Sequence, residues 1–208
     1  MLISPDNSGL DNAASAIKNG ELIAFPTDTY FALGSDGLNP SAVEDVFRTK
    51  GRNPGTPVPL LITGVGMAES LSKDFPDELR KLTDEYWPGA LTVVLPASGK
   101  VPSVVTAGTG TVGLRVPEHD LAREFIRLCG TPLTGTSCNI TGRDPIKEAS
   151  IVEQVFGDQI AMCINAACGT TTEPSTVVSY ESGEISVLRL GAISVDSIRN
   201  CVGDIVVS

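Results

Sequence analysis

The sequence contains few aromatic residues, a single histidine and no paired cysteine motif. Aromatic side chains make up only 5% of the 208 residues, so valine, isoleucine, leucine and alanine must fill the core. The five cysteines include no C-x-x-C pair and His119 is the only histidine, which leaves no plausible zinc ligand set. An odd number of cysteines is here typical of reduced thiols, so we expect a cytoplasmic protein.

The sequence also lacks long apolar runs and the common nucleotide-binding motifs. No stretch reaches 18 apolar residues and no secretory signal is recognisable, so we expect no membrane association. No G-x-x-x-x-G-K-[ST] motif occurs, so any ATP must be held without a P-loop. Residues 108–113 fit G-x-G-x-x-G, but they lead into a strand-like, proline-stopped segment, which favours a tight turn.

Basic residues are outnumbered by acidic ones. The 15 lysines and arginines stand against 25 aspartates and glutamates, which gives a net charge of −10, and no run of Lys or Arg occurs. A broad nucleic-acid-binding face usually carries a basic stripe. The charge therefore favours a small ligand held by locally focused positive charge, and it leaves room for transient contact with tRNA or other RNA.

Strand-like and helix-like segments alternate along the first two-thirds of the chain. Strands are predicted at 21–25, 59–63, 91–95, 112–116, 132–136, 160–164, 176–180 and 185–190. Helices are predicted between many of them, and Ser8 and a Ser41-x-x-Glu44 capping box are expected to begin two helices. The pattern predicts one α/β domain over residues 1–208, with a largely parallel sheet and antiparallel additions.

Three polar pairs have members that are two residues apart in the sequence. They are Thr27/Thr29, Lys50/Arg52 and Ser137/Asn139. In an extended segment, residues i and i+2 project to the same side, so each pair can present two polar groups to one space. The first and third pairs follow predicted strands, where α/β folds gather their ligand contacts.

Two arginines lie on predicted strands: Arg115 in Gly-Leu-Arg-Val-Pro and Arg189 in Val-Leu-Arg-Leu-Gly. A buried guanidinium is costly when isolated, but it makes short, charge-assisted bonds to a phosphate or carboxylate. Solvated helix ends, ion pairs or turns could explain each polar group by itself. Their joint occurrence at strand ends favours one anion-binding cleft, and an enzyme over a scaffold.

These segments, in this order, resemble the threonylcarbamoyl-AMP synthase family, known as YrdC or TsaC, from about residue 17 to residue 191. The shared segments are Pro26–Thr29 with Leu33-Gly34, Lys50–Arg52, Trp87–Thr92, Arg115–Pro117, Ser137–Asn139 with Gly142, Ser175–Val177 and Leu188–Gly191. The resemblance implies a YrdC-like twisted open mixed sheet flanked by helices, with a deep central cavity. The chain is expected to be the short form without a C-terminal extension.

The resemblance also implies an activity. The family condenses L-threonine, bicarbonate and ATP into threonylcarbamoyl-AMP and pyrophosphate, which makes its members nucleotidyltransferases. A separate transferase complex then uses the product for the t6A modification of tRNA. Mg²⁺ is expected to arrive with ATP, since no carboxylate cluster marks a protein-built metal site, and no prosthetic group is expected.

Site residues follow from the matching positions. The resemblance assigns a catalytic group to Lys50, Arg52, Ser137 and Asn139. It assigns threonine binding to Thr29, Arg115 and Ser175. It assigns ATP binding to Lys50, Arg52, Thr111, Ser137, Asn139 and Arg189. Because every substrate carries negative charge, positioning and charge neutralisation are expected to provide most of the catalysis.

The sequence departs from the family pattern at several positions. Tyr30-Phe31-Ala32 replaces the usual Val-Tyr-Gly, Asn53 replaces a proline, and Leu61 stands where many long members have a histidine. These changes bear on substrate affinity more than on reaction class. Two alternatives stay open: a non-catalytic paralogue that binds RNA or ribosomes, and carbamoyl-adenylate chemistry on another substrate.

Overall fold

The computed structural model describes residues 1–203 and 206–207, and its strands form two mixed sheets. The strands are β1 Leu2–Ile3, β2 Ile23–Pro26, β3 Phe31–Gly34, β4 Leu60–Leu61, β5 Leu91–Pro96, β6 Thr111–Arg115, β7 Leu133–Thr134, β8 Thr136–Ser137, β9 Met162–Ile164, β10 Thr176–Glu181, β11 Glu184–Arg189 and β12 Val206–Val207. One sheet has five strands in the order β1-β9-β2-β3-β8, and the other has seven in the order β12-β11-β10-β5-β6-β4-β7. The predicted mixed α/β fold is confirmed, with its strands divided between two sheets. The expectation of a largely parallel sheet was wrong, because β2–β3, β3–β8, β4–β7 and β5–β6 also pair antiparallel.

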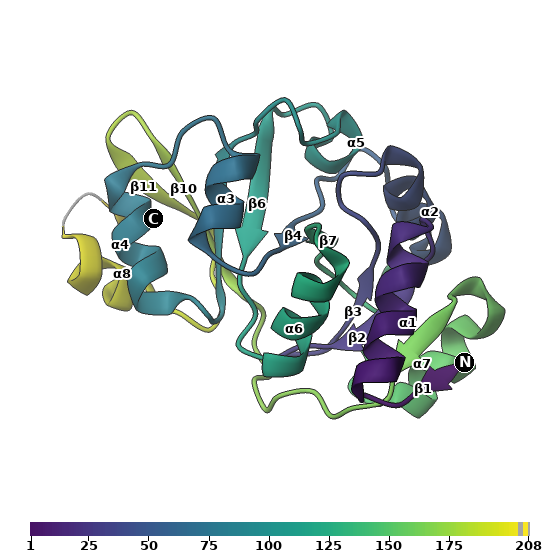
Figure 1. Ribbon diagram of the computed structural model, residues 1–208. Helices are drawn as coiled ribbons and strands as arrows, with labels where there is room; N and C mark the ends of the chain where they lie inside the picture. Colours follow the sequence, from purple (N-terminus) through teal and green to yellow (C-terminus); the bar gives the residue numbers. More distant parts are fainter. Residues whose placement is uncertain (204–205, 208) are drawn as a thin grey trace.

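Helices flank both sheets (Figure 1). They are α1 Asn7–Lys18, α2 Pro40–Lys50, α3 Val65–Leu71, α4 Asp77–Tyr86, α5 Ser103–Thr106, α6 Asp120–Cys129, α7 Ala149–Phe156 and α8 Val195–Val202. Helices α4 and α8 lie at the end of the molecule that carries β10 and β11, whereas α1 and α7 lie at the opposite end (Figure 1). Within the described residues, no helix is long and apolar enough to cross a membrane.

The buried hydrophobic side chains of the described residues form three clusters, one under the seven-stranded sheet and two against the five-stranded sheet. Helices α1 and α6 pack on one face of the five-stranded sheet, where the Phe25 and Phe125 rings meet edge to face with centroids 5.3 Å apart. The larger core, under the seven-stranded sheet, is built from aliphatic side chains such as Leu79, Val93 and Leu114, all fully buried. Aliphatic residues therefore fill most of the interior, as the scarcity of aromatic residues predicted.

Two helix starts differ from the prediction. The Asp6 carboxylate accepts a hydrogen bond from the Gly9 amide, and the Asn39 side chain accepts bonds from the Ser41 and Ala42 amides. The expected caps, Ser8 and the Ser41-x-x-Glu44 box, lie inside the first turns and were wrong. Pro40 explains the second error, because its fixed φ suits the first helical position and places the cap on Asn39.

The chain passes between the sheets three times within the described residues: once through α2, between β3 and β4, and at two further places. At the first of these two, β7 pairs with β4 in the larger sheet and β8 pairs with β3 in the smaller one, with Gly135 between them. A Cβ atom at Gly135 would lie 3.0 Å from the Leu61 side chain, so this turn favours glycine. The second place is the connecting segment 165–175 between β9 and β10, which runs along the lower edge of Figure 1. Both places border the cavity described next.

Candidate functional site

A cavity of about 260 Å³ lies between the two sheets, next to both connections. Its lining includes six of the predicted site residues: Thr29, Arg52, Arg115, Ser137, Ser175 and Arg189. The remaining lining residues are Thr27, Tyr30, Phe31, Ala32, Pro59, Leu61, Thr92, Gly135, Thr136, Pro145 and Pro174. The lining residues include three arginines and several hydroxyl groups, but no carboxylate, so the cavity has the polarity of an anion site.

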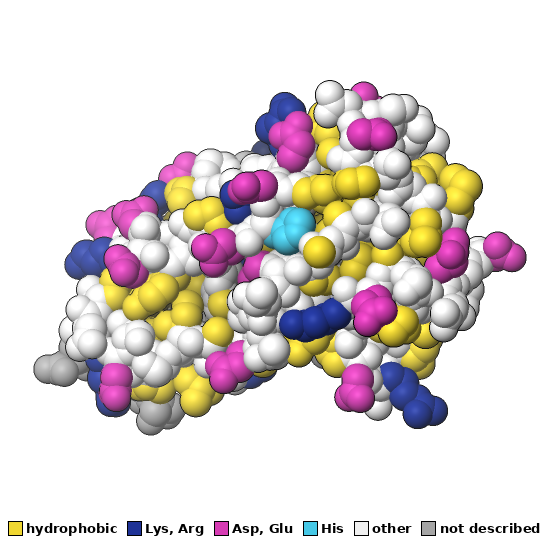
Figure 2. All heavy atoms as spheres, turned by 90° about the horizontal axis from the view of Figure 1, so that it is seen from below, with side chains coloured by type: hydrophobic (Ala, Val, Ile, Leu, Met, Phe, Trp, Pro, Cys, Tyr) yellow, Lys and Arg dark blue, Asp and Glu magenta, His cyan; other side chains and the backbone are white. Residues whose placement is uncertain are grey.

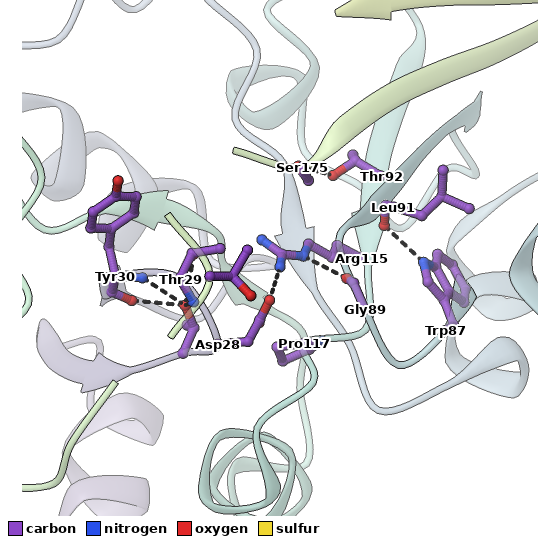
Figure 3. Close-up of polar contacts among 12 residues, drawn as sticks. Asp28, Thr29, Tyr30, Trp87, Gly89, Leu91, Thr92, Arg115, Pro117 and Ser175 are labelled. Atoms are coloured by element: carbon purple, nitrogen blue, oxygen red, sulfur yellow. Dashed lines mark hydrogen bonds and ion pairs between the residues drawn. The ribbon is translucent and has the colours of Figure 1, made fainter. Parts of the chain in front are cut away.

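Arg115 ends β6 and forms a buried ion pair with Asp28 (Figure 3). Its Nη2 donates to Asp28 Oδ2, and its Nε donates to the Gly89 carbonyl oxygen at 2.9 Å. Burial lowers the pKa of Arg115, and the negative charge of Asp28 opposes that shift. The ion pair explains how a charged side chain is tolerated on a buried strand, because Asp28 in the turn between β2 and β3 balances its charge.

The Trp87–Thr92 segment builds the support for Arg115. Trp87 Nε1 donates to the Leu91 carbonyl at 2.8 Å, and the Gly89 amide donates to the Val116 carbonyl at 2.9 Å. A Cβ atom at Gly89 would lie 2.5 Å from the Tyr86 carbonyl oxygen, so no side chain fits there without movement. The segment therefore fixes the end of β6 and presents the carbonyl that receives Arg115 Nε (Figure 3).

A second cluster joins Arg189 to the hydroxyl groups of Ser175, directly before β10, and of Thr92 on β5. Arg189 Nη2 donates to the Ser175 carbonyl at 2.8 Å and to Ser175 Oγ at 3.0 Å. Ser175 Oγ in turn lies 2.9 Å from Thr92 Oγ1. The parallel pairing of β10 with β5 brings Ser175 and Thr92 together, and the β10–β11 hairpin brings Arg189 beside them.

Arg52 reaches the cavity from the segment after α2. Gly51 ends α2 with a left-handed conformation, φ +60°, and so turns the chain between Lys50 and Arg52. Arg52 Nη2 donates to the Pro57 carbonyl at 2.9 Å, while Nε is buried and has no hydrogen-bond partner within the described residues. Burial lowers the pKa of Arg52. A guanidinium with an unused buried donor is suited to receive an anionic oxygen.

Lys50 and Asn139 do not line the cavity. Lys50 is buried, and its ammonium donates to the carbonyls of Ser137 and Asn139 and, at 3.3 Å, to Asn139 Oδ1. Burial lowers the pKa of Lys50 to about 8; Cys138 opposes this shift and Arg52 adds to it. Asn139 Oδ1 accepts from Ser137 Oγ at 2.5 Å, and its amide donates to the Arg143 carbonyl at 2.6 Å.

The predicted nucleotide contact Thr111 lies away from the cavity. It begins β6, the strand that Arg115 ends, and its Oγ1 lies 3.0 Å from Thr109 Oγ1. Its assignment to ATP stays a prediction. In contrast, Thr29 lines the cavity and lies 3.2 Å, oxygen to oxygen, from Thr27 Oγ1, as their spacing of two residues suggested.

Sequence reasoning gave no role to Asp28 or Thr92. Both lie inside matched segments, so the signal was present, but an acidic residue beside a cavity for anions was not an obvious candidate. Its role becomes visible only with Arg115 opposite it. Among the described residues, no group of three His, Cys, Asp or Glu could hold a metal. The five thiols are unpaired, and burial raises the pKa of Cys129 and Cys163 to about 12.

Comparison with known proteins identifies the family. The model of the Sua5/YciO/YrdC family, described as "telomere recombination", matches residues 15–191. The chain belongs to this family. A protein of Pyrococcus abyssi named threonylcarbamoyl-AMP synthase is 35% identical over 193 residues, which is 93% of this chain, and a Bacillus subtilis protein of the same name is 32% identical over 98% of it.

Solved structures of the family share the fold. The crystal structure of P. abyssi Sua5 complexed with L-threonine superposes with a TM-score of 0.94 at 32% identity and covers the whole chain. The chain spans 57% and 59% of the lengths of the P. abyssi and B. subtilis relatives, and 62% of the chain in that crystal structure. The similarity therefore concerns one part of those longer proteins.

Proposed function

We propose that this chain is a threonylcarbamoyl-AMP synthase, a nucleotidyltransferase that condenses L-threonine, bicarbonate and ATP into threonylcarbamoyl-AMP and pyrophosphate. The observation that carries the proposal is the convergence of Arg52, Arg115 and Arg189 on one cavity whose lining residues include no carboxylate. In a protein with a net charge of −10, this local positive charge matches a set of anionic reactants. The names of the relatives point to the same reaction.

Threonine binding is assigned to Arg115, Thr29 and Ser175. Two edges of the Arg115 guanidinium are occupied by Asp28 and Gly89, and the third faces the cavity and receives the threonine carboxylate. The hydroxyl groups of Thr29 and Ser175 complete this half of the cavity. The relative from P. abyssi has been crystallised with L-threonine, which supports the assignment.

ATP binding is assigned to Arg52, Ser137 and Arg189, which line the other parts of the cavity. Arg52 Nε and the Ser137 hydroxyl are suited to phosphate oxygens, since guanidinium–phosphate bonds are short and charge-assisted. Lys50 and Asn139 hold the backbone of the Ser137 segment in place, and they become direct ATP ligands only by exchanging their present contacts. Mg²⁺ enters with the nucleotide.

The proposed chemistry needs no covalent nucleophile from the protein. The threonine amine attacks bicarbonate, a nitrogen–carbon bond forms and water leaves, which gives a carbamate. A carbamate oxygen then attacks the α-phosphorus of ATP, and the bond to the bridging oxygen breaks to release pyrophosphate. The arginines hold the reactants in line and neutralise the charge that develops on the phosphates.

We propose further that the product passes, in the cytoplasm, to a t6A transferase complex that modifies tRNA. An RNA-binding paralogue without activity has less support. Figure 2 shows lysine and arginine side chains scattered among acidic ones, with no continuous basic patch among the described residues of that face. Because a broad RNA footprint requires such a patch, contact with tRNA is expected to be transient.

Pyrophosphate release from ATP tests the proposal. We expect release only when L-threonine and bicarbonate are both present, with threonylcarbamoyl-AMP detected by mass spectrometry. Reactions without threonine, without bicarbonate, or with Arg52→Ala serve as controls. Carbamoyl phosphate in place of threonine and bicarbonate tests the remaining alternative substrate. Salt-dependent RNA binding in the nanomolar range, without ATP binding or pyrophosphate release, would overturn the synthase assignment.

A further inference from the structure

Asp28 joins the two halves of the site. It lies in the turn between β2 and β3, which belong to the five-stranded sheet, while its partner Arg115 ends β6 of the seven-stranded sheet. The exposed fractions of the two side chains are 7% and 11%, so little water reaches the pair. A carboxylate at this depth acts strongly on its partner because solvent screening is weak.

The position of Asp28 is itself fixed from the outer side by the segment that connects β9 to β10. The Gly169 amide donates to the Thr27 carbonyl at 2.9 Å. A Cβ atom at Gly169 would lie 2.5 Å from the Asp28 carbonyl oxygen, so only glycine allows the two backbones to lie this close. The connecting segment therefore lies directly against the backbone of the turn and restricts the movement of Asp28.

Asp28 and Gly89 together determine which way the guanidinium points. The Gly89 carbonyl holds Nε and the Asp28 carboxylate holds Nη2, so two of the three nitrogens are bound to the protein from different directions (Figure 3). Nη1 lies on the remaining side, toward Ser175 and Thr29 (Figure 3). Two fixed bonds on a planar group leave it no rotation, so its free edge stays directed at the cavity.

The negative charge of Asp28 also balances part of the positive charge of the cavity. Arg189 is the second charged group acting on Arg115, and its repulsion disfavours the buried charge. Among the described residues, Asp28 is the carboxylate that pairs with Arg115, and its Oδ1 has no hydrogen-bond partner. Its interaction is therefore directed at Arg115 alone.

We propose that Asp28 is a positioning residue for amino-acid binding: it orients Arg115 so that the free guanidinium edge receives the carboxylate of the substrate. The proposal rests on the proposed function, since it takes Arg115 as the carboxylate ligand. It predicts that Asp28 affects binding only when the substrate has a carboxylate and Arg115 is present.

Measuring the affinities of two ligands by calorimetry tests this prediction. L-threonine and L-threoninamide differ in the carboxylate, so wild-type protein should bind threonine more tightly than the amide. In Asp28→Asn, which keeps the shape and removes the charge, we expect threonine affinity to fall by about tenfold, with the amide changed less than about twofold. The KM for ATP should also change less than about twofold, a split that a general loss of structure does not produce.

Two further variants serve as controls. Asp196→Asn removes an exposed carboxylate from an Asp–Arg pair on α8 and should leave both affinities unchanged. If Asp28→Asn folds poorly, Arg115→Met is compared with the double variant Asp28→Asn/Arg115→Met, in which no buried charge is left unpaired. Adding Asp28→Asn to Arg115→Met should then leave threonine affinity unchanged within about twofold.

The outcomes separate this inference from the proposed function. If wild-type protein binds neither ligand, the proposed function fails. If wild-type protein prefers threonine over the amide and Asp28→Asn keeps the same preference, the inference fails and the proposed function stands. Equal losses for threonine, the amide and ATP also overturn the inference, because they show that Asp28 supports the fold and not the orientation of Arg115.

Discussion

The positively charged residues in the two walls of the cavity have different contacts. The seven-stranded sheet contributes Arg115 and Arg189, each bonded to the protein along part of its guanidinium while lining the cavity. The wall formed by β8 and the end of α2 holds Lys50, whose ammonium is buried and bonded to the protein through three acceptor atoms. The arginines, including Arg52 beside Lys50, thus face the cavity, whereas Lys50 supports the backbone of the wall.

The geometry of the two cations explains this difference. A guanidinium is a planar fork, so protein contacts on two edges leave a third edge for a ligand, but an ammonium has three donors around one atom. Lys50 uses its donors on the segment from Ser137 to Asn139 and so fixes the hydroxyl of Ser137 at the cavity. Two positively charged residues of one K-x-R motif therefore do different work, and the following predictions test that division.

The largest expected loss of activity is at Arg52, and we expect it to occur with little loss of stability. Arg52→Met removes a cavity-facing guanidinium that, within the described residues, donates one hydrogen bond to the protein, to the Pro57 carbonyl. We expect kcat/KM for pyrophosphate release to fall by about 10²–10³-fold, as for loss of a donor to developing charge. The melting temperature should stay within about 3 °C of wild type, since little packing is lost. A large drop in melting temperature would place Arg52 with Lys50 as a wall-building residue.

A smaller effect with a different signature is expected at Lys50. Lys50→Met leaves the carbonyls of Ser137 and Asn139 without their donor, so we expect kcat/KM to fall by about 10–100-fold. Because Lys50 and Asn139 support the same segment, the loss in Lys50→Met/Asn139→Ala should be clearly smaller than the product of the single losses. Lys50→Met/Arg189→Ala, which joins opposite walls, is the matched control and should show multiplicative losses.

Much of the fold followed from the sequence. The strand that Arg115 ends and the strand that follows Ser175 were predicted, and six site residues were predicted that line one cavity. Strand β3 was missed: Phe31–Gly34 is four residues long, directly follows the Thr27–Thr29 turn and ends in glycine, so it lacks a strand-length pattern. The division into two sheets was also missed, because it depends on the crossing at Gly135, which no local pattern marks.

The roles of single side chains were harder to predict than their neighbourhood. A spacing of two residues placed Lys50 and Arg52 together, but the left-handed turn at Gly51 directs one inward and the other to the cavity. The role of Asp28 depends on a partner 87 residues away in the sequence. Sequence patterns indicate which residues gather at a site, whereas the direction of each donor is set by tertiary contacts.

The pH dependence of stability tests whether the Lys50 ammonium is buried in the folded protein. Burial lowers the pKa of Lys50 to about 8 in the folded protein from 10.5. Below pH 8 both states hold the proton; between about pH 8 and 10.5 the folded state releases it while the unfolded state keeps it, so stability should rise with pH in this window. We expect the unfolding free energy of wild type relative to Lys50→Met to increase by at most about 1.4 kcal/mol per pH unit there.

Chemical denaturation of both proteins at pH 7, 8, 9 and 10 provides the measurement, and the difference between them removes the contributions of other titrating groups. A difference that stays flat below pH 8 and rises above it confirms that the ammonium is buried in the wall. A difference that falls with pH contradicts it, because it means that the folded state binds the proton more tightly than the unfolded chain.

The smallest expected effect concerns the connection between the two walls. Tyr30 OH donates to the Thr172 carbonyl at 2.7 Å, and Lys147 Nζ lies 5.1 Å from the Tyr30 ring centroid and donates to the Thr171 carbonyl at 3.2 Å. Tyr30→Phe removes only the first of these bonds, which is partly exposed, so we expect threonine KM to rise less than about threefold. Hydrogen exchange of residues 170–174 should become faster, with no change in α1.

Lys147→Gln is the matched variant for that experiment, because it keeps a donor for the Thr171 carbonyl but removes the charge above the ring. If the connecting segment is held mainly by backbone contacts such as that between Gly169 and Thr27, its amide hydrogens will exchange as slowly in both variants as in wild type. Faster amide exchange in Tyr30→Phe alone would instead show that the phenolic hydroxyl of Tyr30 holds this segment in place. The walls would then be joined in part by a side chain that departs from the family pattern, and substrate affinity in this chain would depend on that departure.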